Sequence, residues 1–206
     1  MAALLVVCLA AALVGAVITR VGRGPRPALA SSGRIACGVE RWAVKTLTDP
    51  GARLVNFRPR PTTVSTLRRL RPTGTYARGK GVERRTYRVR ARLVESRLED
   101  DQDFHLVIVD LRYPSRTMIV EFPDPACTRH AVQKRRLQMQ SARSRFINAC
   151  GFPSSSSFDR LRGTASIIGV GFFDFIHGQA GVAPNGIELH PVLLYEGQVL
   201  VTTWVG

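Results

Sequence analysis

The chain has 206 residues, of which 45% are hydrophobic, and this composition is sufficient for one globular domain with an apolar core. Its formal net charge of +15 at pH 7 points to an anionic partner such as a nucleic acid. Residues 1–98 hold 20 Lys and Arg residues against 4 acidic ones, whereas residues 99–206 hold 10 against 11, so the second half is excluded as the source of the excess charge.

Residues 1–30 are predicted to be a signal peptide or membrane-targeting segment. The first 18 residues are uncharged and almost entirely apolar, a length that suits a signal-peptide core better than a membrane span. A small-residue cleavage pattern ends at Ala30. The order of charges favours instead a membrane anchor with a cytoplasmic C-terminal domain. Arginines follow the apolar run, and no Lys or Arg precedes it. We expect a secreted or extracytoplasmic protein, with membrane association through residues 2–18 as the alternative to cleavage.

Residues 31–82 are predicted to be a basic N-terminal extension and linker. Weak patterns in this region favour a strand at residues 39–46 and a short helix at residues 62–70, with Thr62 as its N-cap. Residues 71–82 combine Pro, Gly and basic residues without periodicity, and a loop is expected there.

Residues 83–206 carry the clearest signal and are predicted to form a β-barrel domain. In residues 87–95, Arg88, Arg90 and Arg92 alternate with Tyr and aliphatic side chains, which is the period-two pattern of a half-buried strand. Further strands are expected at residues 104–111, 117–122, 163–175 and 187–194, with a weaker one at 198–204. A helical period before Gly151 predicts a helix within residues 128–150.

Three strands, a helix and two more strands follow one another in the order of an OB-fold, a small five-stranded Greek-key barrel. No parallel βαβ rhythm competes with this order. The expected fold class is therefore mostly β, with an OB-fold-like five-stranded barrel, one helix between strands 3 and 4, and an irregular N-terminal extension.

The cysteines support export, because disulfides persist in oxidising compartments. Cys127 and Cys150 flank the predicted helix, and a bridge between them would contribute about 3 kcal/mol. Two buried free thiols are the alternative. Cys8 would leave with a cleaved signal, and the pairing of Cys37 stays open.

Four phrases, "ERWAVKT", "DFHLVIVD", "TMIVEFPDPAC" and "GFFDFIHGQAGVAPNGIELHPV", resemble those of a family of uncharacterised secreted bacterial proteins. The resemblance covers about residues 37–194 and implies export and a compact β domain, but no activity or catalytic residue. The order of elements is also similar to that of staphylococcal-type nucleases. Their Asp-Gly-Asp-Thr signature is absent, and "DDQDFH" at residues 100–105 occupies the comparable turn, which argues against nuclease activity.

Three residues near the ligand face of the predicted barrel are catalytic candidates. In an OB-fold this face is set by strands 2 and 3 and rimmed by the loops joining strands 1–2 and 4–5. Asp103 belongs to the first of these loops, which is rich in acidic residues, and His105 follows it. Glu121 lies near the end of the third strand. Solvation of the acidic turn is the alternative interpretation.

A metal site is a second expectation for this rim. Asp174 and His177 lie in the loop before the last strand, and Glu188 and His190 lie two residues apart on that strand, so they point to the same side. Carboxylates with imidazole suit Zn²⁺, Mn²⁺ or Fe²⁺, and carboxylates alone suit Ca²⁺ or Mg²⁺. Structural roles in a turn and in a bulged or edge strand are the alternative, since Pro191 follows His190.

The arginine stripe is a candidate ligand surface. Arg88, Arg90 and Arg92, with Phe104 as a stacking residue, could contact the phosphates of a polyanion or single-stranded nucleic acid without reading its sequence. A solvated polar face is the alternative. Aromatic residues for base stacking are few, mainly Phe104 and Tyr113, which argues against sequence-specific recognition.

Three functions remain open from the sequence. The first is an exported binding protein that engages an anionic ligand (polyanion, nucleic acid or saccharide) non-specifically. The second is a metal-dependent hydrolase acting on phosphodiesters, with a divalent metal as cofactor. The third is a structural or interaction protein of the cell envelope. The sequence does not distinguish an enzyme from a binding protein, and it does not specify an oligomeric state.

Overall fold

The computed structural model describes residues 37–38, 40–72 and 76–199. The signal or membrane-targeting segment predicted at residues 1–30 lies outside these ranges, as does most of the weak strand predicted at residues 198–204. Within the described ranges, no helix is long and apolar enough to cross a membrane.

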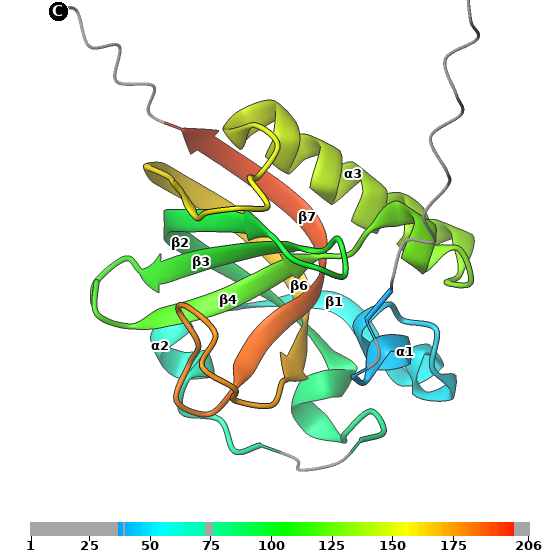
Figure 1. Cartoon of the computed structure of the whole chain (residues 1–206). Helices are drawn as coiled ribbons and strands as arrows, with labels where there is room; N and C mark the ends of the chain where they lie inside the picture. The colour runs from blue at the N-terminus through cyan, green and yellow to red at the C-terminus, as the bar shows by residue number, and fades with distance from the viewer. Residues whose placement is uncertain (1–36, 39, 73–75, 200–206) are drawn as a thin grey trace, which may run out of the picture. The chain divides into compact units, whose positions relative to one another are not determined.

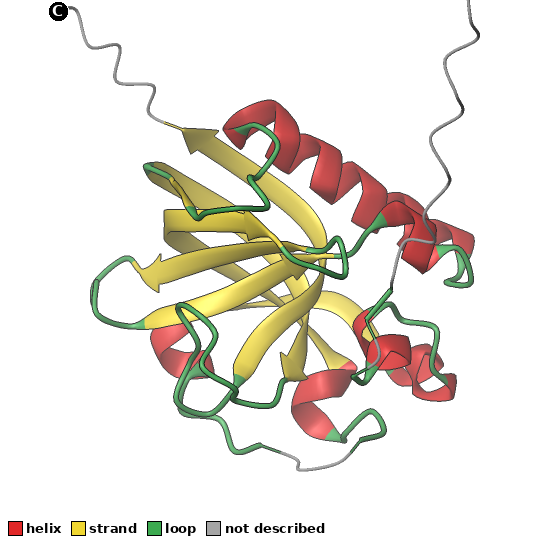
Figure 2. Ribbon diagram, viewed as in Figure 1, coloured by secondary structure: helices red, strands yellow, loops and turns green. Residues whose placement is uncertain are grey.

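Five strands close a barrel in the order of an OB-fold (Figures 1 and 2). In spatial order they are β2 (Arg85–Leu98), β3 (Phe104–Asp110), β4 (Thr117–Phe122), β7 (Ile187–Val199) and β6 (Gly163–Phe173). Strand β2 pairs with both β3 and β6, which closes the barrel, and β4 runs parallel to β7. The single long helix, α3 (Gln133–Cys150), follows β4, so the predicted OB-fold-like class is confirmed. A two-residue strand, β5 (Asp159–Arg160), adds to β2.

Strand β2 shows how the sequence pattern builds the barrel wall. Arg88, Arg90 and Arg92 are exposed, while Val89 and Ala91 between them are fully buried. The alternation predicted from the sequence is therefore present, because successive side chains of a strand point to opposite faces. A bulge in the pairing with β3 interrupts the 14-residue strand and bends it, so that it can pair with β3 and β6.

An aromatic cluster fills the barrel beside α3. The ring of Phe146 from α3 lies 5.1 Å from Phe122 of β4, 5.8 Å from Phe104 of β3 and 5.4 Å from Tyr195 of β7. All four side chains are almost fully buried. The helix thus packs against β7, as Figure 1 shows, and completes the hydrophobic core.

The region before the barrel consists of short elements. They are α1 (Trp42–Lys45), the 3-10 helix η1 (Pro50–Leu54), β1 (Asn56–Thr62), α2 (Val64–Leu67) and the 3-10 helix η2 (Gly81–Arg84). The strand predicted at residues 39–46 is wrong, because one turn of helix occupies it after Arg41, whose φ is 52°.

Two of these elements pack directly on the barrel. Strand β1, which was not predicted, pairs with β2 at an edge of the sheet, and an edge strand tolerates its two prolines. Helix α2 is shorter than predicted and is capped by Thr63, not Thr62, since the Thr63 hydroxyl accepts a hydrogen bond from the Thr66 amide. Val64 and Leu67 of this helix are fully buried in the main core.

A disulfide joins Cys37 to Cys127, with 5.8 Å between their Cα atoms. The predicted Cys127–Cys150 bridge is therefore wrong. Cys150 ends α3, whereas Cys127 lies before the other end of that helix, in the 3-10 helix η3 (Pro125–Thr128). An 18-residue helix is about 27 Å long, which keeps the two thiols beyond disulfide reach. The thiol of Cys150 instead lies 3.2 Å from the Tyr195 hydroxyl. A bridge spanning 90 positions contributes about 4–5 kcal/mol when only its restriction of the unfolded chain is counted.

Candidate functional site

Three barrel strands place acidic and imidazole side chains on one outer face. Val120 of β4 and Leu189 of β7 point into the apolar core. Because side chains alternate along a strand, Glu121 and Glu188 point to the opposite face, as does His105 of β3. All three are buried even though they lie outside the core. The outer face of β3 and β4 is the ligand face of an OB-fold.

Strand register brings these residues together. In the antiparallel β3–β4 pair, His105 lies opposite Glu121. In the parallel β4–β7 pair, Ile119 lies opposite Glu188, and two residues further along each strand Glu121 and His190 come side by side. The β6–β7 register shifts near His190, so the predicted bulge is present, although β7 lies inside the sheet between β4 and β6 and is not an edge strand. Segments that are far apart in sequence therefore share one site.

Asp103, Glu121 and His190 form a compact group that can hold a metal ion. One ligand atom from each residue lies within 4.8 Å of the others. His190 Nδ1 is 2.8 Å from Glu121 Oε2, and His190 Nε2 is 3.2 Å from Asp103 Oδ2. These contacts have ion-pair distances without hydrogen-bond angles, so within the described ranges neither imidazole nitrogen has a hydrogen-bond partner. The imidazole is fully buried, and Asp103 Oδ2 also lacks a hydrogen-bond partner within those ranges.

Burial and neighbouring charges shift the pKa of all three residues. Burial raises the pKa of Asp103 to about 6, although His190 opposes this shift. Burial alone would lower the pKa of His190, but Glu121 and Asp103 outweigh it and raise the pKa to about 9. Burial also works against the Glu121 carboxylate, yet His190, His105 and Lys45 hold its pKa well below the usual value. A charged Glu121 therefore lies at the centre of the group.

Two further charged groups border this centre. Burial, together with Glu121 and Asp174, raises the pKa of Glu188 well above its usual value, which favours the neutral acid. Lys45 of α1 donates to Asp174 at 2.9 Å. Burial would lower the pKa of Lys45, but Glu121, Glu188 and Asp174 raise it, so the ammonium remains charged. Lys45 thus supplies a permanent cation beside the carboxylates.

His105 lies on the other side of Glu121. Its Nε2 is 3.0 Å from the Ala180 carbonyl oxygen, which can only accept, so Nε2 carries the hydrogen. Its Nδ1 lies 3.4 Å from Glu121 Oε1 and 3.4 Å from Glu99 Oε1. A backbone carbonyl that fixes the tautomer in this way is typical of metal-binding histidines.

A pocket of about 220 Å³ opens over Glu121 and His105. It is lined by the acidic loop before β3, by the loop after β6 and by Lys45. Five of its nine lining residues are Asp or Glu, and Lys45 is the sole Lys or Arg among them. The pocket therefore favours a cation, and it gives solvent access to an otherwise buried group.

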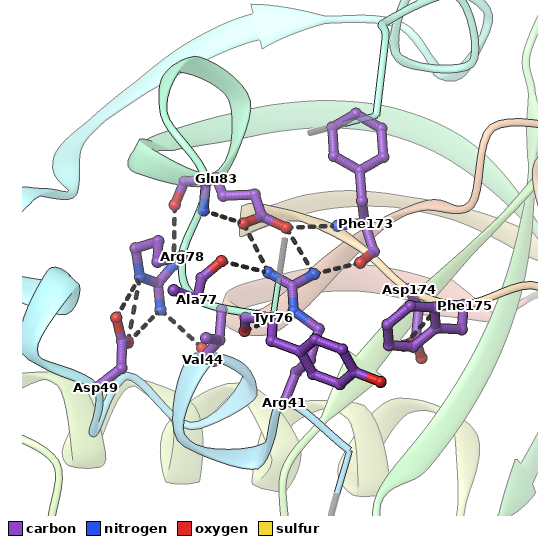
Figure 3. Close-up of polar contacts among 11 residues, drawn as sticks. Arg41, Val44, Asp49, Tyr76, Ala77, Arg78, Glu83, Phe173, Asp174 and Phe175 are labelled. Atoms are coloured by element: carbon purple, nitrogen blue, oxygen red, sulfur yellow. Dashed lines mark hydrogen bonds and ion pairs between the residues drawn. The ribbon is translucent and has the colours of Figure 1, made fainter. Parts of the chain in front are cut away.

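Buried ion pairs hold the segment that carries Lys45 (Figure 3). Arg41, just before α1, donates to both carboxylate oxygens of Glu83 at 2.9 and 2.8 Å. Arg78 donates to both carboxylate oxygens of Asp49, just before η1. These two clamps fix both ends of residues 41–49, and with them the position of Lys45.

The remaining predicted ligand residues lie apart from this centre. His177 is exposed at the rim of the pocket. Arg88, Arg90 and Arg92 are exposed on β2, where Arg90 borders a different groove. Phe104 is fully buried in the aromatic core and has no exposed surface on which a base could stack.

Sequence reasoning missed Lys45 as a member of the site. It lies in a region predicted to be an irregular extension, and its approach to Asp174 spans 129 positions. No local pattern signals such a contact.

The fold and site define an OB-fold-like barrel with a buried carboxylate–histidine centre on the outer face of β3, β4 and β7. Comparison of the chain with protein-family models, curated proteins and solved structures gave no match. The resemblance to secreted bacterial proteins and to staphylococcal-type nucleases stays a prediction, and the function has to be inferred from the site itself.

Proposed function

We propose that this protein binds a divalent metal ion through Asp103, Glu121 and His190. The observation that carries the proposal is the convergence of two carboxylates and one imidazole, all buried, with both nitrogens of His190 directed at carboxylate oxygens. Burying these groups together is costly unless a cation or proton compensates them. A metal ion compensates two carboxylates and accepts the imidazole lone pair.

The donor set favours a transition metal. One imidazole and two carboxylates suit Zn²⁺, Mn²⁺ or Fe²⁺, whereas Ca²⁺ and Mg²⁺ prefer oxygen donors alone. Three protein ligands with a pocket beside them resemble the open sites of catalytic metals more than closed structural sites.

Metal-dependent hydrolysis of a phosphodiester is the activity that we propose for this centre. A bound ion would polarise a substrate oxygen and lower the pKa of a bound water. The chain's own contribution is a small acidic pocket that orients the ion, with Lys45 as the nearest fixed positive charge for a substrate oxyanion. Neutralisation of the carboxylates by the ion would allow an anionic substrate to approach.

Metal titration tests the proposal. The chain with its disulfide formed is stripped with a chelator and titrated with Zn²⁺ or Mn²⁺ by calorimetry. The titration is run at pH 8, because the ion must displace a proton from His190. We expect tight binding and hydrolysis of bis-p-nitrophenyl phosphate that needs the ion. Asp103→Asn should lose both, and Glu95→Gln, on β2 and outside the lining of the pocket, should keep both. A wild-type chain that binds neither ion would overturn the proposal.

A second candidate function, binding of an anionic ligand, is favoured by a separate groove of about 640 Å³. Arg90 of β2 and Arg145 of α3 line it, together with Thr164 and Ser166 of β6. Within the described residues, neither arginine forms a hydrogen bond or an ion pair, so both guanidinium groups can bind phosphate or sulfate oxygens.

Heparin chromatography tests this second candidate. The Arg90→Ala/Arg145→Ala chain should elute at a clearly lower salt concentration than wild type, because each lost phosphate or sulfate contact reduces the salt dependence of binding. Arg53→Ala/Arg58→Ala, which removes two exposed charges elsewhere, is the charge-matched control. Equal elution of the two double variants would show that net charge alone causes retention, and no retention of wild type at low salt would exclude the interaction.

We also propose that the protein acts outside the cytoplasm. The apolar stretch at residues 1–18 and the Cys37–Cys127 disulfide both support this location, because structural disulfides are rare in reducing compartments.

A further inference from the structure

The carboxylate of Glu121 lies between two imidazoles. Its Oε2 is 2.8 Å from Nδ1 of His190, and its Oε1 is 3.4 Å from Nδ1 of His105. Each imidazole also faces a second carboxylate, Asp103 beside His190 and Glu99 beside His105. The same pair of ligand types is therefore repeated on the two sides of one shared carboxylate.

The two halves come from different elements. His105 and Asp103 belong to the start of β3 and the residues before it, Glu121 belongs to β4, and His190 belongs to β7. Glu99 lies at the beginning of the acidic turn, whose backbone is closed by the Glu99 amide donating to the Asp103 carbonyl at 3.0 Å. This closure places Glu99 and Asp103 close together in space, one beside each histidine.

The state of His105 supports metal binding on its own side. The side chain is 3% exposed, and its Nε2 hydrogen is donated to the Ala180 carbonyl. Whenever the imidazole is neutral its lone pair is on Nδ1, and this atom lies 3.4 Å from a carboxylate oxygen of Glu99 and 3.4 Å from one of Glu121. A buried histidine with one nitrogen held by a carbonyl and the other facing two carboxylates has the arrangement of a metal ligand with its supporting partner.

We propose that Glu121 bridges two divalent cations, the first bound by Asp103 and His190 and the second by Glu99 and His105. This inference rests on the proposed function and extends it from one ion to two. Bridged pairs of ions in enzymes lie about 3.5–4 Å apart and together bind the oxygens of phosphate esters. The second ion would lie nearer the pocket, because Glu99 and His105 line it together with Glu121.

The charge of the pocket fits this arrangement. Five lining residues contribute carboxylates, namely Glu99, Asp100, Asp101, Glu121 and Asp174, and Lys45 is the sole Lys or Arg among them. A phosphate oxyanion would be repelled by such a pocket. With two divalent cations bound, the same pocket would attract an oxyanion, so the inferred ligand class is a phosphate monoester or diester whose oxygens contact both ions.

Ion pairing is the competing explanation for the cluster. If both imidazoles are protonated, they can neutralise the neighbouring carboxylates without any metal. Binding stoichiometry separates the two explanations, because a cluster satisfied by ion pairs has no free ligand set to offer to a second cation.

Native mass spectrometry of the chelator-stripped chain, reloaded with Mn²⁺, counts the bound ions. We expect two ions in wild type and one in Glu99→Gln. Glu99 is 36% exposed, so this replacement leaves the fold intact. The matched control is Glu95→Gln, on β2 and outside the lining of the pocket, which should keep two ions. His105→Gln should also bind one ion, with circular dichroism as the check on folding.

Electron paramagnetic resonance supplies a readout that does not depend on counting. Two Mn²⁺ ions that share Glu121 should give an exchange-coupled spectrum in wild type and the isolated-ion spectrum in Glu99→Gln. One ion in wild type, unchanged by Glu99→Gln, would overturn the bridged pair and leave the proposed function standing. No ion in wild type would overturn both. Two ions with uncoupled spectra would overturn the bridging role of Glu121.

Discussion

Replacing Glu83 with Ala should lower the free energy of unfolding by about 3–5 kcal/mol, the range observed when one partner of a buried ion pair is removed. Glu83 is fully buried, and its two oxygens accept from Arg41 and from the backbone amides of Gly79 and Phe173. Figure 3 shows the contacts of Glu83 with Arg41 and Phe173. The variant would leave a buried guanidinium without a counter-ion and two amides without acceptors.

Urea denaturation followed by tryptophan fluorescence measures this loss. Glu40→Ala, which removes an exposed carboxylate from the same segment as Arg41, is the matched control and should change stability by less than about 0.5 kcal/mol. Glu83→Gln should fall between the two, because it keeps the shape and one acceptor oxygen but loses the charge. Equal midpoints for Glu83→Ala and Glu40→Ala would show that the clamp contributes nothing.

The same replacement should weaken the candidate metal centre indirectly. Arg41 immediately precedes α1, whose last residue is Lys45, and Lys45 contacts Asp174 at the edge of the centre. Loss of the clamp therefore loosens the cover over the buried carboxylates and lets water reach them. Stability and site geometry are coupled through residues 41–49.

The barrel was predictable because its signals are local. Alternation in β2, apolar runs in β3 and β4, and the helical period before Gly151 each lie within one element. Together they specify an OB-fold order, and that order by itself predicts that the acidic loop before β3 and the loop before β7 share one ligand face.

The disulfide and the packing of the N-terminal region against the barrel could not be predicted from local patterns, because they join residues that are far apart in the sequence. Cys37 and Cys127 are separated by 90 positions, and Arg41 and Glu83 by 42. The sequence predicted Cys150 as the partner of Cys127 because the two cysteines are close in sequence. The straight helix between them instead holds them far apart in space. Short elements such as α1 and β1 carry too few residues for a periodic pattern to be recognised.

The candidate site was predictable in its residue types but not in its grouping. Asp103, Glu121 and His190 were assigned to different roles from the sequence, and strand register unites them. A single-residue shift of β4 against β7 would move Glu121 to the core face. The register of the strands therefore decides whether these residues form a centre. That register is set by the apolar residues that alternate with them and pack into the core.

Replacing His190 with Gln should abolish the stabilisation that a metal ion gives to this protein. An ion that binds only the folded state adds about 2.7 kcal/mol when its free concentration is 100 times the dissociation constant. Loss of a direct ligand should weaken binding by more than about 100-fold, since even residues that only orient a ligand change affinity about 10–100-fold. At the same ion concentration the variant should then gain less than about 0.5 kcal/mol.

Thermal and urea unfolding of both chains, with and without Zn²⁺, measure this difference. His130→Gln, at an exposed position before α3, is the matched control and should keep the full metal-dependent gain. The metal-free His190→Gln chain should itself be less stable than wild type, because Asp103 and Glu121 lose the imidazole between them and remain buried. A metal-dependent gain equal to that of wild type would remove His190 from the centre, and with it the link between the strand register of this barrel and its proposed chemistry.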